Sequence, residues 1–328
     1  MIAFVKKILP DRFILMLLAA LAIAWAVPVS GDILSMTRNI SFAAIFGLFF
    51  LHGLRLSRQQ VGQAMRDWRV QAAIFFMVFI AMPIFGWLLI KIISPPLVPQ
   101  LITGIFFMTI LPSTVQSAIS FTSLARGNVA ASVVAATLIN LSAVIMTPMM
   151  LAAYSLTSGA AFEWSLVRNI ALLLLLPFAL GQMMQPFLGE WAATKSAMLA
   201  KFDKGVILLS VYVGFAASVA SGALGIVDVR ALSWIFAICA IMLVFSFSAS
   251  WLLGKYLGMN LENRISILFA GAHKSIATGA PMAAILFPKE TGLFLLPVII
   301  YHIGQLIISA PLADKLAQKI YRNYRPDN

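Results

Sequence analysis

Long apolar runs divide this chain, and they restrict its fold more than any other feature of the sequence. A run of about 20 apolar residues forms a helix that crosses a bilayer. With 62% of its 328 residues hydrophobic and 10% charged, the chain carries more apolar surface than one soluble core could bury. The pattern predicts an all-α polytopic membrane protein, a single transmembrane unit over residues 1–328 with ten helices. The runs fall near 12–28, 39–56, 69–93, 99–124, 129–154, 165–186, 203–221, 229–257, 264–287 and 291–317.

Basic residues are distributed unevenly over the short connections between these runs. The net charge is +12, and most of the 23 lysines and arginines lie on the side that holds both termini. The opposite side keeps Arg38, Lys91, Arg168, Arg230 and Lys289. Since short cytoplasmic loops retain lysine and arginine, both termini are predicted to be cytoplasmic in a plasma (inner) membrane. The positive charge therefore requires no nucleic-acid partner; the lipid bilayer is the expected surrounding.

The acidic residues all lie in loops, at span ends or in the tails. This placement excludes aspartyl intramembrane proteolysis and proton relays built on carboxylates. The chain has no HExxH motif and no G-x-S-G motif, and Cys239 is the single cysteine, so neither an intrachain disulfide nor a cysteine metal cluster is expected. We therefore predict no enzyme and no cofactor.

The fourth apolar run contains a predicted break at Pro112. Proline removes a backbone donor and clashes with the preceding turn, so a helix kinks or ends there. Polar side chains after the proline are expected to satisfy the freed backbone groups: Ser113, Thr114, Gln116 and Ser117.

A matching break is predicted in the ninth run, from Gly271 to Ser275, with Gly279 and Pro281 following. The two breaks lie half a chain apart, and five spans per half require the halves to be inverted, as residues 1–156 and 157–328. This arrangement needs residues 12–28 as a helix, so we interpret them as the first span and not as a cleaved signal peptide. Discontinuous helices at matching positions of inverted halves indicate the binding site of a secondary transporter.

Four motifs resemble the bile acid:sodium symporter family, in particular its SBF-like symporter branch, whose vertebrate relatives are an orphan bile acid carrier. The resemblance covers nearly the whole chain. It implies a panel domain of spans 1, 2, 6 and 7, and a core domain of spans 3–5 and 8–10 in which the broken spans 4 and 9 cross. The motifs are Leu111-Pro112-Ser-Thr-Val-Gln-Ser117, Ala125-Arg-Gly-Asn-Val129, Arg264-Ile-Ser-Ile267 and Gly271-Ala-His-Lys-Ser275.

The sodium-binding positions that the family implies are largely replaced in this chain. Phe269, His273 and Lys274 stand where sodium-coupled members have a glutamate, a glutamine and an asparagine. Ser117 and Ser132 match retained hydroxyl ligands, whereas other ligand positions fall on Val78, Ala118 and Ala136. The resemblance therefore implies that sodium does not bind in the usual way, with a residual site at Ser117 and Ser132 as the alternative.

Lys274 is the charged residue expected at mid-membrane depth. It lies ten residues beyond Arg264, which places it about 15 Å into the bilayer. An unpaired charge there costs at least a few kcal/mol, so the options are helix C-terminal carbonyls, an anionic substrate or loss of the proton. We interpret the ammonium as standing in the place of a coupling cation, as a counter-charge for an anion or a protonation switch. The alternative is a lysine that only ties the crossover together.

Three neighbours complete the candidate site. His273 is a proton carrier or a neutral hydrogen-bond donor, Ser275 follows Lys274 in the break, and Asn140 is the span-5 residue expected to touch substrate. The resulting hypothesis is a secondary active transporter of a small organic anion, coupled to protons or to no ion. A sodium-coupled symporter is the alternative within this class, and a non-transporting membrane regulator or scaffold is the alternative from another class.

Overall fold

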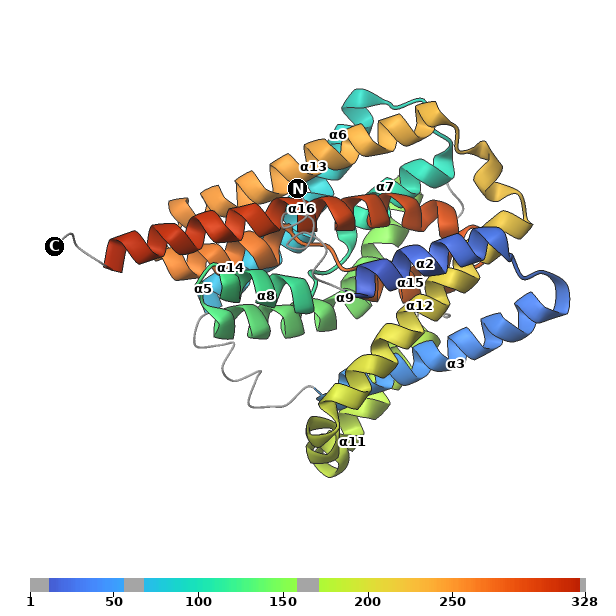
Figure 1. Cartoon of the computed structure of the whole chain (residues 1–328), viewed down its shortest axis with the longest axis horizontal. Coiled ribbons are helices and arrows are strands. Elements are labelled where there is room, and N and C mark those ends of the chain that lie inside the picture. The colour runs from blue at the N-terminus through green and yellow to red at the C-terminus, as the bar shows by residue number, and fades with distance from the viewer. Residues whose placement is uncertain (1–11, 56–67, 158–170, 325–328) are drawn as a thin grey trace.

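The computed structural model describes residues 12–55, 68–157 and 171–324, and every regular element in these ranges is a helix (Figure 1). Some of the basic residues used for the topology prediction lie outside the described residues: Lys6, Lys7, Arg58, Arg66 and Arg325 on the predicted cytoplasmic side, and Arg168 on the opposite side. The elements are α2 (Arg12–Ala26), α3 (Gly31–Arg55), α5 (Trp68–Phe76), η1 (Met77–Ala81), α6 (Met82–Ile93), α7 (Pro99–Ile110), α8 (Gln116–Leu124), α9 (Val129–Thr157), η2 (Ala171–Leu175), α11 (Leu176–Thr194), α12 (Ser196–Ala220), η3 (Ala223–Ile226), α13 (Val229–Tyr256), α14 (Leu261–Ala272), α15 (Ile276–Leu286) and α16 (Thr291–Tyr324).

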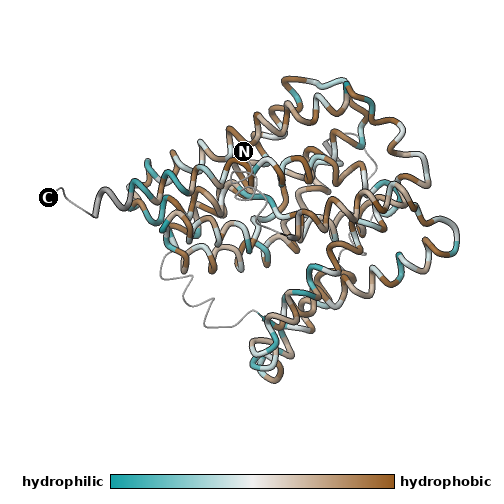
Figure 2. Tube along the Cα trace, in the orientation of Figure 1, coloured by the Kyte–Doolittle hydropathy of each residue, from teal (hydrophilic) through white to brown (hydrophobic). Residues whose placement is uncertain are grey.

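Seven helical stretches in the described ranges are long and apolar enough to cross a membrane. Two shorter apolar helices, Leu15–Ala26 and Pro99–Ile110, accompany them. Hydrophobic residues make up most of the length of these helices, and hydrophilic residues are more frequent toward helix ends (Figure 2). The long stretches are Gly31–Arg55, Trp68–Ile93, Val129–Ser155, Leu172–Thr194, Ser196–Ala220, Val229–Tyr256 and Thr291–Lys319.

Several helices are longer than the apolar runs that predicted them. The second span begins at Gly31 and not near residue 39, and the sixth continues to Thr194. The i→i−4 hydrogen-bond ladder does not depend on side-chain polarity, so a helix extends into polar sequence until a turn residue stops it. Both predicted breaks are present, between α7 and α8 and between α14 and α15.

The helices α2, α3, α11 and α12 pack on one another in one part of the molecule, which we call the α3–α12 group (Figure 1). At the contact of α3 with α11, a Cβ added to Gly53 would collide with the Phe178 carbonyl, and one added to Gly181 would collide with the Phe50 carbonyl. Glycine at both positions therefore permits backbone-to-backbone packing, as is common between membrane helices.

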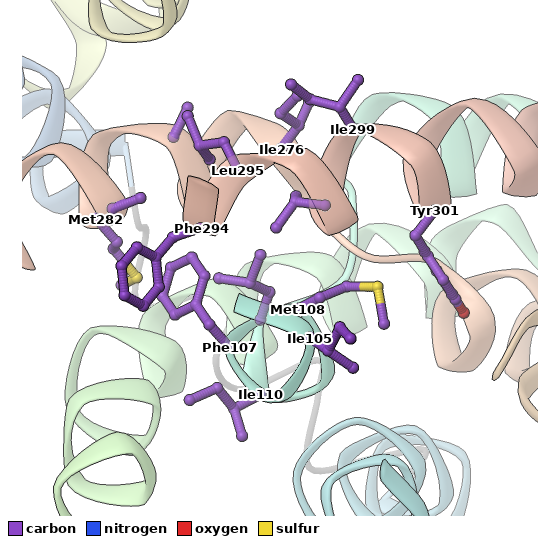
Figure 3. Close-up of a cluster of buried hydrophobic side chains, with 14 of the residues drawn as sticks. Ile105, Phe107, Met108, Ile110, Ile276, Met282, Phe294, Leu295, Ile299 and Tyr301 are labelled. Carbon is purple, nitrogen blue, oxygen red and sulfur yellow. The ribbon is translucent and has the colours of Figure 1, made fainter. Parts of the chain in front are cut away.

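The remaining long helices surround α7 and the two breaks. A buried cluster of apolar side chains joins α7 to α15 and α16, and in it Phe107 lies beside Met282 and Phe294 (Figure 3). Phe287 links these helices, stacking on Phe294 at 3.5 Å between ring centroids and meeting Phe107 edge-on at 5.9 Å. This packing holds the two interrupted helices together.

Candidate functional site

The first break places backbone carbonyls in the protein interior without partners in α7. Leu111 is extended, with ψ at 149°, because the residue before a proline is excluded from the helical region. A buried carbonyl needs a donor, particularly inside a membrane. Each carbonyl from 109 to 113 has one: Thr109 and Leu111 accept from the Lys274 ammonium at 2.6 and 2.8 Å, Ile110 from the Thr147 hydroxyl at 2.8 Å, Pro112 from the Ser275 N–H at 2.8 Å, and Ser113 from the Asn140 amide at 2.9 Å.

These donors differ from those expected from the sequence. They come from α9 and from the second break, not from the polar side chains that follow Pro112. The Ser113 hydroxyl is buried and has no hydrogen-bond partner among the described residues, and Gln116 is exposed. The last carbonyls of α7 point along the helix axis, toward elements beyond the end of the helix. The side chains just after Pro112 do not lie in that direction.

Lys274 is fully buried at the centre of this arrangement. Its Nζ donates to the carbonyls of Val78 at 3.1 Å, Thr109 at 2.6 Å and Leu111 at 2.8 Å. An ammonium has three N–H donors, so the three carbonyls satisfy it completely. Of the partners expected for this charge, helix C-terminal carbonyls are observed at Thr109 and Leu111, where the negative end of the α7 dipole favours a cation. The third acceptor, Val78, lies within the π-helical turn η1.

The second break is held by α16. Gln305 accepts from the Lys274 N–H at 2.7 Å and donates to the Lys274 carbonyl at 3.1 Å. The Tyr301 hydroxyl donates to the Ala272 carbonyl at 2.8 Å. His302 Nδ1 lies 2.8 Å from the Gln305 side-chain nitrogen, so this histidine is hydrogen-bonded in the interior.

Direct hydrogen bonds join the two breaks. The Ser275 N–H donates to Pro112, and its hydroxyl caps α15 by accepting from the Thr278 N–H at 3.2 Å. Asn140 bridges both sides, because its amide donates to Ser113 while its oxygen accepts from the Thr278 hydroxyl at 2.7 Å. Residues separated by more than 130 positions thus form one hydrogen-bonded unit.

His273 connects this unit to the hydroxyls of the fourth span. Its Nδ1 lies 3.1 Å from the Thr114 hydroxyl and 3.2 Å from that of Ser117, and its Nε2 lies 2.8 Å from the Ser309 hydroxyl. The imidazole is fully buried among the rings of Phe121, Phe247 and Phe269. Both ring nitrogens therefore have hydroxyl partners that can act as donor or acceptor.

A cavity of about 580 Å³ separates the α3–α12 group from the breaks. Five of the residues predicted for the site line it: Thr114, Gln116, Ser117, Asn140 and Ser275. The other candidates are buried and do not line the cavity: Pro112, Ser113, Ser132, His273 and Lys274. The predicted site is therefore divided into a layer that faces the cavity and a buried layer that supports it.

The proposed sodium ligands Ser117 and Ser132 have different neighbours. Ser117 is hydrogen-bonded to Thr114 at 2.6 Å and to His273. The Ser132 hydroxyl is buried and donates to that of Thr122 at 3.0 Å. In the described ranges, no group of three or more histidine, cysteine, aspartate or glutamate side chains is arranged to hold a metal ion.

Sequence reasoning missed the charged residues on the other cavity wall. His52, Arg55, Asp203 and Lys204 come from α3 and α12 and line the cavity. The charge pattern gives basic residues a role in topology and places acidic residues at span ends, and it does not relate these four side chains to one another. Only the packing of α3 on α12 shows that they face the same space as Gln116 and Asn140.

Long apolar helices together with two interrupted helices that meet beside a cavity are typical of secondary transporters, whose discontinuous helices form the substrate site. This is the class of protein that the fold and site define. The family model of the SBF-like CPA transporter family matches residues 11–318, and the chain therefore belongs to this transporter family. Its relatives are membrane transporters and not enzymes.

Curated relatives match over nearly their full length. PA2026 of Pseudomonas aeruginosa is 37% identical over 318 residues, which cover 95% of each chain. The "Putative symporter YfeH" of Escherichia coli is 36% identical over 306 residues, covering 93% of this chain and 92% of the relative. Sodium/bile acid cotransporter 7-A of Xenopus laevis is 23% identical over 311 residues, covering 92% of this chain and 90% of the relative.

Proposed function

We propose that this protein is a secondary active transporter that moves a small organic anion by alternating access. In this proposal the chain forms ten spans in two inverted five-helix repeats, residues 1–156 and 157–328. The α3–α12 group is the panel domain, and the spans that contain α5 to α9 and α13 to α16 form the core. Both termini face the cytoplasm of a plasma (inner) membrane, a placement supported by the bias in basic residues.

The cavity between the two groups is the observation that carries this proposal. Its volume of about 580 Å³ fits a drug-sized solute, and one wall consists of the interrupted helices. Apolar side chains such as Leu48, Phe178 and Ile207 line it together with hydroxyls and amides. Movement of the panel against the core would expose such a site to each side of the membrane in turn.

The position of Lys274 supports transport without sodium. Its ammonium occupies three carbonyls that would otherwise be available to a cation, and the family resemblance implies that sodium-coupled members have a sodium-site asparagine at this position. Because this cation is part of the protein, the two breaks need no mobile cation between them. The coupling partner is then a proton, or there is none. His273, hydrogen-bonded to the cavity-lining Thr114 and Ser117, is the residue through which a proton would act.

A sodium-coupled symporter is the second candidate. Relatives named sodium/bile acid cotransporters favour it, as do the hydroxyls of Ser117 and Ser132. The same names make bile acids the first cargo to test. A non-transporting regulator remains the alternative of another class.

The deciding experiment compares thermal stability of the purified protein in sodium chloride and choline chloride at matched ionic strength, from about pH 5.5 to about 8.5. A ligand that binds the folded state stabilises it by RT ln(1 + [L]/Kd). We expect no saturable sodium effect, whereas saturable stabilisation by sodium would establish the sodium symporter.

Transport itself is tested by counterflow of labelled cholate into proteoliposomes, with and without a pH gradient. Accumulation that a pH gradient changes would support proton coupling. Absence of counterflow for cholate and for a panel of smaller carboxylates would favour the non-transporting alternative.

A further inference from the structure

The charged side chains of the cavity all lie on one wall. Arg55 at the end of α3, together with Asp203 and Lys204 of α12, provides one net positive charge. The opposite wall, formed by the breaks with α8, α9 and α15, presents neutral polar groups such as Gln116 and Asn140. An amphipathic anion with a polar group distant from its charge matches this arrangement.

Arg55 and Asp203 form an ion pair that links α3 to α12. Arg55 Nη1 lies 2.6 Å from Asp203 Oδ2, and Nη2 lies 3.4 Å from Oδ1. The side chains are 27% and 18% exposed, so the pair is largely withdrawn from solvent. Guanidinium has five N–H donors in a planar fork, and Asp203 uses one end of it.

The pairing of Arg55 is incomplete. Its Nε is buried and has no hydrogen-bond partner among the described residues. A buried guanidinium with an unpaired N–H is unfavourable, and a second carboxylate could accept a hydrogen bond on the Nε side of Arg55. Exchange of one carboxylate for another at this guanidinium would keep the Arg55 charge paired throughout. The Asp203 carboxylate that is released lines the cavity together with Lys204.

We propose that Arg55 binds the anionic group of the transported solute and that Asp203 is the internal carboxylate that holds Arg55 while no solute is bound. The solute is then an amphipathic carboxylate, with its charge at the α3–α12 wall and its polar groups toward the breaks. This inference rests on the proposed transport function. It also assigns anion recognition to the panel, while Lys274 remains a buried cation of the core.

The test uses the full chain in lipid nanodiscs and the probes acetate and hexanoate, with acetamide and hexanamide as neutral counterparts. Asp203→Ala leaves Arg55 without its carboxylate, so this variant should be stabilised saturably by hexanoate and not by hexanamide. The apparent Kd for hexanoate should be about tenfold or more below that of acetate, because the alkyl chain enters the apolar cavity. The apparent Kd for hexanoate should also be lower in Asp203→Ala than in the wild type, because in the wild type Asp203 competes with hexanoate for Arg55.

The double variant Arg55→Gln/Asp203→Ala removes both charges and keeps the pair neutral, so it separates recognition from folding. It should lose the response to carboxylates. Lys201→Gln, an exposed α12 residue that does not line the cavity, changes the net charge as Arg55→Gln does and should respond like the wild type. Equal stabilisation of the single and double variants by hexanoate, or none in Asp203→Ala, would overturn the assignment.

The two proposals can fail separately. Loss of the hexanoate response in Asp203→Ala with cholate counterflow intact would remove Arg55 from the site and leave transport standing. A carboxylate response that depends on Arg55, without counterflow of any tested anion, would make the cavity a binding site in a protein that does not transport.

Discussion

The two helix breaks share a backbone geometry but not a cause. The residue that ends α7, Leu111, has ψ at 149°, and the residue that ends α14, His273, has ψ at 145°. Pro112 follows Leu111 and imposes the extended conformation locally. Lys274 follows His273 and imposes nothing of the kind, so the second break depends on bonds from α16 and from the first break.

The breaks also contribute opposite chemistry. The first presents carbonyl oxygens to the interior, and the second presents an ammonium, an N–H and a capped helix start. Each supplies what the other lacks, and neither is satisfied alone in a membrane interior. The comparison shows that the first break, which Pro112 imposes locally, supplies contacts that maintain the second break, which no local residue imposes.

Lys274→Met gives the largest expected effect. It removes the donor shared by the Val78, Thr109 and Leu111 carbonyls, and buried acceptors without donors should lower stability by about 3 kcal/mol or more. Thermal unfolding in nanodiscs measures this loss, and cholate counterflow should disappear. Lys255→Met, at an exposed lysine of α13, is the matched control. Wild-type stability in Lys274→Met would show that the carbonyls do not need the ammonium.

Gln305→Leu tests whether the second break depends on α16. It leaves the Lys274 N–H unpaired and the Lys274 carbonyl with only the 3.4 Å contact to His302 Nδ1, and the expected loss is about 2 kcal/mol. Thr147→Val removes one donor from the first break, where Pro112 maintains the geometry, and should cost about 1 kcal/mol. The reverse order in thermal unfolding would contradict the distinction between a local and a tertiary break.

Lys274→Ala vacates the carbonyl site without filling its volume, and a soluble cation should then take the place of the ammonium. Methylammonium or sodium at ten times its Kd should restore about 1.4 kcal/mol of stability. Choline, which is too large for the vacated space, serves as the control. If wild type and variant respond equally to methylammonium, the carbonyls are not a cation site.

Gln116→Leu should have the smallest effect on stability, since this side chain is exposed at the start of α8. It lines the cavity, so cholate counterflow should fall more than in Gln182→Leu, whose side chain in α11 does not. A greater transport defect in Gln182→Leu would contradict the placement of the cavity beside the first break.

Much of the fold could be predicted because its signals are local. Apolar run length located the long helices, and Pro112 located the first break. The Gly271–Ser275 segment located the second through its composition. Helix ends were less accurate, as at Gly31 and Thr194, because apolar length reports the membrane core and not the end of the hydrogen-bond ladder.

The candidate site was only partly predictable. The sequence indicated that Lys274 needed a partner at mid-membrane depth, and the choice among carbonyls, anion and deprotonation depended on what α7 and η1 place near it. Thr147, Tyr301 and Gln305 had no signal that set them apart from other polar residues in membrane helices. Their roles follow from contacts between segments far apart in the chain.

The sequence by itself determined a membrane-embedded helical protein, the break at Pro112 and one deeply buried cation, since hydrophobic length, proline geometry and charge position act through the local chain. Tertiary structure alone decided which groups face the cavity. It buried Lys274 outside the cavity lining and brought Arg55 and Asp203 into that lining. The physical reason is that solvent access and hydrogen-bond pairing depend on helix packing, which brings together residues that no sequence interval relates.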